Sequence, residues 1–198
     1  MPHAPHARRA LLIAVAASAA LAMVTAVILR AMGQPWWCVC GRIRPWVHDI
    51  WSSHCSQHLL DAYSLTHVSH GLILAPVLAL ACRSWGVSVP ARFLAALVIE
   101  AVWEILENSP PIIERYRTAT MSLNYTGDSV VNSMGDLLSC GLGFVLVHRL
   151  GLWRAAAIFA ASELALLITI RDNLTLNVLM LTWPLESVRV WQAAGQGG

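Results

Sequence analysis

Three stretches of this sequence hold histidines, carboxylates or an asparagine at helical spacing. They contain, in order, His67 and His70; Glu100, Glu104 and Glu107; and Asp128, Asn132 and Asp136. Residues three or four positions apart lie on one face of a helix, so each stretch would form a polar stripe. An ionisable side chain inside a membrane helix costs of order 3 kcal/mol even on the lenient insertion scale. Stripes of this kind therefore favour a polar interior site between helices.

One chemistry that fits these residues is metal binding. Two imidazoles with several carboxylates form an acceptable ligand set for zinc, iron or manganese. In helical bundles such ligands project inward from facing helices. The metal interpretation uses His67, His70, Glu100, Glu104 and Glu107. The Glu-x-x-His pairing of di-iron bundles is absent, so the sequence suggests a divalent metal without specifying it.

The other chemistry needs no metal. His67 or His70 would act as general base or nucleophile, and carboxylates would orient the imidazole. The catalytic residues in this interpretation are His67, His70, Glu104 and Asp128, and the substrate-binding residues are Asp61, Arg115, Arg117, Asn132 and Asp136. The arginine pair would clamp a phosphate, because a planar guanidinium binds phosphate bidentately.

Structural roles remain open for the same residues. The carboxylates of Asp61, Glu107 and Asp128 could simply lie at helix ends in the membrane interface. The two histidines could be packing residues with satisfied hydrogen bonds, and the two arginines could anchor the chain at the interface. Glu163, isolated in a later apolar run, is either a further member of the site or a lone hydrogen-bonded carboxyl.

The elements that must position these residues are membrane helices. Of the 198 residues, 57% are hydrophobic and only 12% are charged, whereas an ordinary soluble domain has roughly 25% charged residues. The net charge is +2 and every basic residue is arginine, which argues against a nucleic-acid partner. The sequence predicts an all-α, polytopic membrane helical bundle that forms a single domain over residues 1–198.

We expect five transmembrane helices, because each crossing needs about 20 mainly apolar residues. They lie at about 11–30, 64–82, 91–107, 128–148 and 154–171, and a short re-entrant or interfacial segment follows at 174–191. The first run is longer than a typical signal-peptide core, so we interpret it as an uncleaved anchor. Pro110 and Pro111 end the third helix, so residues 112–126 form a loop or an interfacial helix.

Successive spans alternate in direction, which places the three polar stripes in the same leaflet. They lie at the start of the second helix, the end of the third and the start of the fourth. The positive-inside rule favours a cytoplasmic N-terminus in the cell inner membrane. The polar site would then face the periplasm.

The loop after the first helix carries Cys38, Cys40, His54, Cys55 and His58. In an oxidising compartment Cys38 or Cys40 could pair with Cys55 as a disulfide. Metal binding by the cysteines and histidines is the alternative.

Three runs resemble a known family. QHLLDAYSLTHVSHG (57–71), EAVWEILENSPPIIERYR (100–117) and NYTGDSVVNSMGD (124–136) are similar to an uncharacterised family of small bacterial inner-membrane proteins that carries a domain-of-unknown-function label. That resemblance implies no particular activity.

A more distant resemblance is to VanZ-like membrane proteins. Their pattern is matched by Asp61 and His67, Glu100 or Glu104, Arg115 or Arg117, and Asp128, Asn132 and Gly135. This resemblance implies a site at the outer leaflet and a role around the cell envelope, its lipids or its glycans.

The leading functional hypothesis is an enzyme that acts on a lipid or a lipid-linked head group. The alternative is a non-catalytic subunit or assembly factor of a larger membrane complex that binds a metal or cofactor. A small transporter ranks third, because the chain has no inverted repeat.

Overall fold

The computed structural model describes residues 4–122 and 124–195, and every regular element within them is helical. The α-helices are α1 (Ala4–Ala31), α2 (Ser64–Ala81), α3 (Val89–Glu107), α4 (Pro110–Ala119), α5 (Val130–Leu150), α6 (Leu152–Ile170), α7 (Leu174–Thr182) and α8 (Glu186–Ala193). A single 3-10 turn, η1 (Arg83–Trp85), follows α2. The predicted all-α class is confirmed.

Four of these helices are long and apolar enough to cross a membrane. They are α1 over Arg8–Ala31, α2, α5 and α6. The fifth predicted span, α3, has the same length as α6, 19 residues, but it carries Arg92, Glu100, Glu104 and Glu107. Composition alone therefore supports a membrane protein with four spans, and the crossing by α3 stays a prediction.

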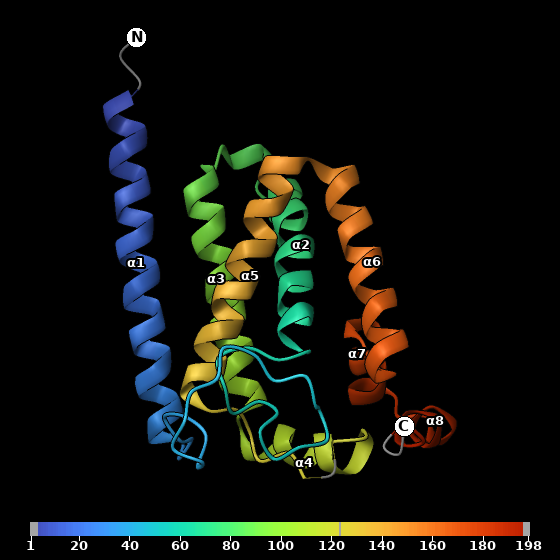
Figure 1. Cartoon of the computed structure of the whole chain (residues 1–198). Helices are drawn as coiled ribbons and strands as arrows, with labels where there is room; N and C mark the ends of the chain where they lie inside the picture. Colours follow the sequence, from blue (N-terminus) through green and yellow to red (C-terminus); the bar gives the residue numbers. More distant parts are fainter. Residues whose placement is uncertain (1–3, 123, 196–198) are drawn as a thin grey trace.

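The helices α2 and α5 form the closest pair in the bundle (Figure 1). A Cβ atom added to Gly71 would lie 2.0 Å from the carbonyl oxygen of Cys140, and one added to Gly143 would lie 2.0 Å from that of Val68. Only glycine allows two backbones to approach this closely, as small residues do in membrane bundles. This contact fixes how the stripes on α2 and α5 face each other.

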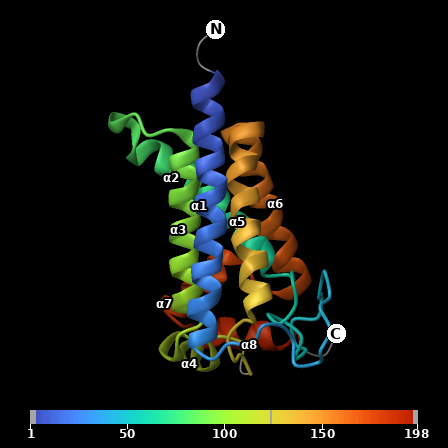
Figure 2. The same cartoon turned by 90° about the vertical axis from the view of Figure 1, so that its left-hand side faces the viewer.

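Helix α1 lies on the outside of the bundle, where it runs along α3 and α5 (Figure 2). Only 6% of its most apolar window is buried, and large side chains such as Leu12, Val15 and Val27 are exposed. An apolar surface of this extent marks contact with a membrane or with another protein.

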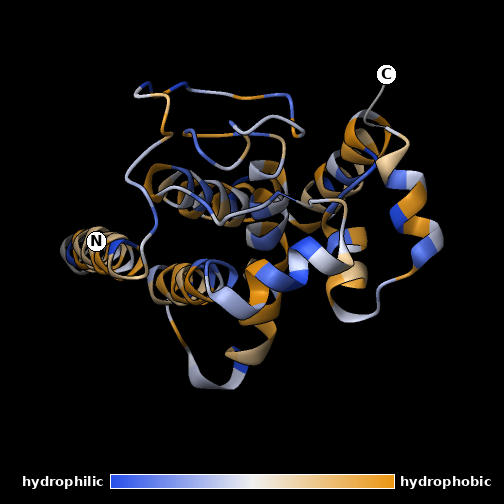
Figure 3. Cartoon of the chain, turned by 90° about the horizontal axis from the view of Figure 1, so that it is seen from below, coloured by the Kyte–Doolittle hydropathy of each residue, from blue (hydrophilic) through white to orange (hydrophobic). Residues whose placement is uncertain are grey.

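The polar segments gather at the end of the bundle opposite the N-terminus (Figure 1). They are the loop over residues 32–63, α4 and α8. Seen from that end, α4 lies across the bundle and α8 lies at its edge near the C-terminus, and both carry hydrophilic residues beside apolar ones (Figure 3). The loop is tied to α5 because the carbonyl oxygens of Pro35 and Trp36 accept hydrogen bonds from the amides of Val130 and Val131 at 2.8 and 3.0 Å.

The structure adds detail to two local predictions. The segment predicted at 174–191 contains two helices, because Pro184 follows the end of α7 and cannot continue its hydrogen bonding; its re-entrant or interfacial placement stays a prediction. Of the two alternatives for residues 112–126, a loop or an interfacial helix, the structure has a helix over the first part, α4, which begins at Pro110 because proline costs no hydrogen bond in the first turn.

Candidate functional site

The three polar stripes meet at His67. Its Nδ1 atom lies 2.5 Å from Oε1 of Glu100 and 3.4 Å from Oε1 of Glu104, and its Nε2 atom lies 3.8 Å from Oδ2 of Asp136. These residues come from α2, α3 and α5. All four side chains are buried, so the structure brings them into one cluster inside the bundle.

His70 belongs to the same cluster. Its Nδ1 atom lies 2.9 Å from Oε2 of Glu100, and the rings of His67 and His70 stand edge to face with centroids 5.1 Å apart. Glu100 therefore accepts hydrogen bonds from both histidines. One carboxylate fixes the orientation of two imidazoles.

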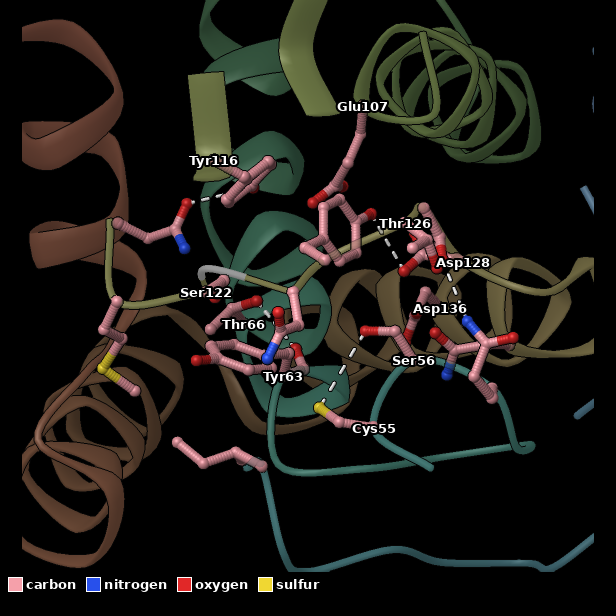
Figure 4. Close-up of a pocket in the computed structure, with 18 of the residues that line it drawn as sticks. Cys55, Ser56, Tyr63, Thr66, Glu107, Tyr116, Ser122, Thr126, Asp128 and Asp136 are labelled. Atoms are coloured by element: carbon pink, nitrogen blue, oxygen red, sulfur yellow. Dashed lines mark hydrogen bonds between the residues drawn. The ribbon is translucent and has the colours of Figure 1, made fainter. Parts of the chain in front are cut away.

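A cavity of about 530 Å³ adjoins this cluster. Segments from the loop, α2, α3, α4, α5, α7 and α8 surround it, and its ionisable or amide lining includes His67, His70, Glu107, Asp128, Asn132 and Asp136. Glu107, Asp128 and Asp136 approach the cavity from separate elements (Figure 4). Figure 4 also labels Cys55, Ser56 and Tyr63 on the loop side.

Asp128 lies just before α5 and is held on both carboxylate oxygens. Oδ1 accepts from the hydroxyl of Tyr125 at 3.0 Å and Oδ2 accepts from Nδ2 of Asn108 at 3.2 Å. Burial raises the pKa of Asp128 well above its ordinary value, and the nearby carboxylates of Glu107 and Asp136 raise it further. Asp128 therefore keeps its proton to a higher pH than an exposed aspartate does.

Asp61 takes a different position. Its Oδ2 accepts from the amide of Ser56 at 2.7 Å and its Oδ1 accepts from the amide of Tyr63 at 2.8 Å. Burial raises the pKa of Asp61, while these backbone hydrogen bonds oppose the rise. Asp61 organises the end of the loop and is not among the residues that line the cavity.

Several buried polar atoms have no hydrogen-bond partner among the described residues. Near the His67 cluster and the cavity they include Oε1 and Oε2 of Glu104, Oε2 of Glu107, Oδ1 of Asp136 and Nδ2 of Asn132; the others are Nε of Arg92, Oγ of Ser133 and Oε1 of Gln192. Native proteins leave few buried polar groups unsatisfied. The unpaired carboxylate oxygens of the first group are therefore candidate ligands for a cation or partners for a polar ligand.

The predicted arginine pair points elsewhere. Nε of Arg115 donates to the carbonyl oxygen of Leu181 at 2.8 Å, and Nε of Arg117 donates to that of Tyr125 at 2.6 Å. Neither residue is part of the described lining of the cavity. Arg189 does line it, but it forms a salt bridge with Glu186 at 2.6 Å.

The structure decides between the two alternatives for Glu163 and bears on the cysteines. Glu163 is a hydrogen-bonded carboxyl outside the cluster, because it accepts from the amides of Leu174 and Thr175 at the start of α7, where a carboxylate suits the helix dipole. The proposed disulfide to Cys55 is wrong: the described cysteines are all free, and Sγ of Cys55 lies 3.8 Å from Oδ2 of Asp61.

Sequence reasoning missed Asn108 and Tyr125, which hold Asp128. A signal was present for Asn108, since it continues the four-residue spacing of Glu100 and Glu104. Tyr125 gave no periodic signal, because it lies in the irregular segment before α5.

Two groups of side chains within the cluster could each hold a metal ion. The first group takes one candidate ligand atom from each of His67, Glu104 and Asp136, and these three atoms lie within 4.8 Å of one another. The second group takes one atom from each of His67, His70 and Glu100, within the same distance. Glu100 and Glu104 lie near Nδ1 of His67, and Asp136 lies on the Nε2 side of the same ring. A histidine that donates its other nitrogen to a carboxylate is the usual arrangement around a bound metal.

Comparison with known proteins places this chain among relatives of similar length. A family model described as "Protein of unknown function (DUF2585)" matches residues 29–194. A UPF0314 protein of Rhizobium meliloti (strain 1021) is 46% identical over 186 residues, which cover 94% of this chain and 93% of the relative. A UPF0314 protein of Paracoccus denitrificans (strain Pd 1222) is 49% identical over 157 residues, with coverages of 79% and 80%.

No solved structure matches this chain. The descriptions of the family model and of these relatives do not mention VanZ, so that resemblance stays a prediction. The region matched by the family model contains the His67 cluster, the cavity lining and the cysteine and histidine loop. As the resemblance of its three polar runs predicted, the chain belongs to the DUF2585 family of proteins of unknown function.

Proposed function

We propose that this protein is a membrane-embedded, metal-dependent enzyme that acts on the polar head group of a lipid or a lipid-linked substrate. The observation that carries the proposal is the His67, Glu104 and Asp136 group, whose candidate ligand atoms lie within 4.8 Å of one another beside a cavity of about 530 Å³. A cavity of this size is within the range of small-molecule sites.

The ligand set favours a divalent cation of borderline or hard character. One ring nitrogen of His67 with oxygens of Glu104 and Asp136 would supply one nitrogen and two carboxylate donors, which suit zinc, iron or manganese. Three protein ligands leave a position for water or substrate, as catalytic metal sites do. Glu100 would act as a positioning residue, because it contacts Nδ1 of His67 and is not a member of this group.

Asp128 is suited to proton transfer. A carboxyl whose pKa is raised by burial and by neighbouring carboxylates can give its proton to a leaving oxygen. Glu107 also lines the cavity and has an unpaired buried oxygen. In this proposal Asp128 is the general acid, and a metal held by His67, Glu104 and Asp136 would supply Lewis-acid polarisation of the substrate.

The proposal includes a fifth span at α3 and a site that faces the periplasm from the cell inner membrane. In this orientation the arginines at the polar end lie outside the cytoplasm, which the positive-inside rule disfavours unless contacts within the protein hold them there. Three of them support that reading: Arg115, Arg117 and Arg171 each donate to a backbone carbonyl oxygen. The arginines of the opposite end, Arg8, Arg9, Arg83, Arg92, Arg149 and Arg154, would lie in the cytoplasm.

The test compares wild-type protein with Glu104→Gln and His67→Ala, purified and reconstituted into vesicles of bacterial inner-membrane lipids. Metal content is measured by mass spectrometry, and head-group release is followed by lipid analysis. Glu114→Gln is the matched control, because Glu114 is an exposed carboxylate on α4. We expect the first two variants to lose cavity metal and activity, and the control to keep both.

The enzyme proposal fails if the wild-type cavity binds no metal and if Glu104→Gln and His70→Ala retain full function in cells. A non-catalytic subunit of a larger membrane complex is the second candidate, and the exposed apolar surface of α1 favours it. Isolation of the intact protein in a stable complex with larger membrane subunits would support this alternative.

A further inference from the structure

We propose that Cys38, Cys40, His54 and His58 bind a structural zinc ion in the loop between α1 and α2. One ligand atom from each residue lies within 4.8 Å of the others. Two thiols and two imidazoles are the donor set of many structural zinc sites. This zinc site is separate from the His67 cluster and does not rest on the proposed enzymatic function.

The distances among the donor atoms match a tetrahedron. Zn–S bonds of about 2.3 Å and Zn–N bonds of about 2.0–2.1 Å place neighbouring ligand atoms about 3.3–3.8 Å apart. Sγ of Cys38 lies 3.2 Å from Nδ1 of His54, Sγ of Cys40 lies 3.9 Å from Nε2 of His58, and the two ring nitrogens are 3.3 Å apart. The four donors are thus nearly in place around one point.

The backbone supports the same arrangement. The amide of Cys40 donates to Sγ of Cys38 at 3.4 Å, which stabilises a thiolate at that position. Cys38 and His58 are each only 1% exposed, so half of the site is held inside the loop. Cys40 is exposed, and it would close the site from the outside.

The sequence spacing also fits, with one departure. His54 and His58 are separated by three residues, and 13 residues separate Cys40 from His54. Both values fall within the ranges of zinc sites of the type with two cysteines and two histidines. One residue separates the cysteines, where two is usual. That shorter spacing brings Sγ of Cys38 within reach of the Cys40 amide.

Zinc binding changes the protonation of His58. In this structure the amide of Arg44 donates to Nδ1 of His58 at 3.1 Å, so the proton of the neutral ring lies on Nε2. A metal on Nε2 requires that proton to move to Nδ1. Binding therefore lengthens the contact with Arg44 and gives the His58 ring a measurable change of tautomer.

The zinc would shape the wall of the cavity. The loop has no helix between Met32 and Tyr63, and loops of this length without regular structure are uncommon in compact domains. The two histidine ligands bracket Cys55, Ser56 and Gln57, which line the cavity. Fixing His54 and His58 therefore fixes the segment between them.

The experiment uses the full-length protein purified in detergent. Zinc content is measured by mass spectrometry, the ligand atoms by X-ray absorption, and the thiolate ligands by the charge-transfer bands of the cobalt-substituted protein. We expect one zinc per chain bound to two sulfur and two nitrogen atoms. Cys40→Ser and His54→Ala should weaken zinc binding at least tenfold, and Cys38→Ser should do the same.

His48→Ala and Cys82→Ser are the matched controls and should keep the sulfur-bound zinc. His48 is an exposed histidine of the same loop, and Cys82 lies at the C-terminal end of α2, outside the loop. His67→Ala should also keep it, which separates this site from the cavity. If Cys38→Ser does not fold, Cys40→Ser decides, since that position is exposed. The proposal is overturned by wild-type protein without sulfur-bound zinc, by a Cys38–Cys40 disulfide, or by unchanged zinc content in Cys40→Ser.

Discussion

Replacement of Glu100 by glutamine tests whether this carboxylate positions His67 for a metal. Glu100 accepts from Nδ1 of His67 at 2.5 Å and from Nδ1 of His70 at 2.9 Å, and it is only 1% exposed. Glutamine keeps the size of the side chain and one acceptor oxygen, but it removes the negative charge that makes the imidazole a stronger ligand. The shape of the cluster is therefore preserved while its electrostatics change.

The expected effect follows from known metal sites. Loss of a carboxylate behind a ligating histidine typically lowers metal affinity by about 10- to 100-fold, which corresponds to about 1.4–2.7 kcal/mol. The assay is a titration of the purified protein with Mn²⁺ followed by electron paramagnetic resonance. Manganese is the suitable probe because oxygen-rich sites bind it while thiolate sites prefer zinc.

Glu114→Gln, an exposed change on α4, should leave the Mn²⁺ dissociation constant unchanged. Thermal unfolding of each variant separates a positioning role from a structural one. A lower melting temperature for Glu100→Gln with wild-type affinity for Mn²⁺ would refute the reasoning, because the hydrogen bonds would then serve only to stabilise the fold.

Three further predictions concern packing, pH and metal removal. Gly143→Ala should sharply reduce the yield of folded protein, because its Cβ would lie 2.0 Å from the Val68 carbonyl oxygen. Gly141→Ala should be tolerated, because its Cβ would have its nearest contact at 3.4 Å. Size-exclusion profiles of the two purified variants test this difference. Burial raises the pKa of Asp172 from 3.8 to about 6, so the folded state takes up the proton at a higher pH than the unfolded state does. The free energy of unfolding should therefore increase as the pH falls from 7 to 4, by up to about 3 kcal/mol. Thermal melts of Asp172→Asn should lack this part of the pH dependence, and a pH dependence identical to that of the wild type would contradict the assignment. Removal of metal by EDTA should increase the rate of protease cleavage within residues 41–57 of the wild-type protein but not of Cys40→Ser. The cleavage sites are identified by mass spectrometry of the fragments. Equal cleavage rates of the wild-type protein with and without EDTA would argue against a metal in the loop.

Helical periodicity predicted much of the bundle. The spacing of Glu100 and Glu104 and of Asp128, Asn132 and Asp136 placed each set on one face, and the alternation of spans placed those faces at the same end of the bundle. Those inferences need only the regular geometry of a helix, which sequence spacing encodes directly. The structure accordingly brings members of all three stripes to His67.

The remaining features depend on irregular backbone. The guanidinium groups of Arg115 and Arg117 bind carbonyl oxygens of distant segments, and no periodic pattern predicts which carbonyl lies within reach. The loop is similar: Cys55 is closer in sequence to His54 than either Cys38 or Cys40 is, yet only the latter two share a candidate site with His54. A turn at Ser56, whose φ of 60° is unusual for a serine, directs neighbouring side chains to different sides.

The close contact of α2 with α5 has a consequence for how this site would evolve. Because Gly71 and Gly143 leave no space between the two backbones, neither helix can slide or rotate without a clash, and the cluster at His67 keeps one geometry. The opposite wall of the cavity is a loop whose shape depends on a few side chains. Under the proposed function, reactivity and substrate preference would be carried by separate parts of the chain, and exchange of residues 41–57 between relatives should alter which head group is accepted while the chemistry stays the same.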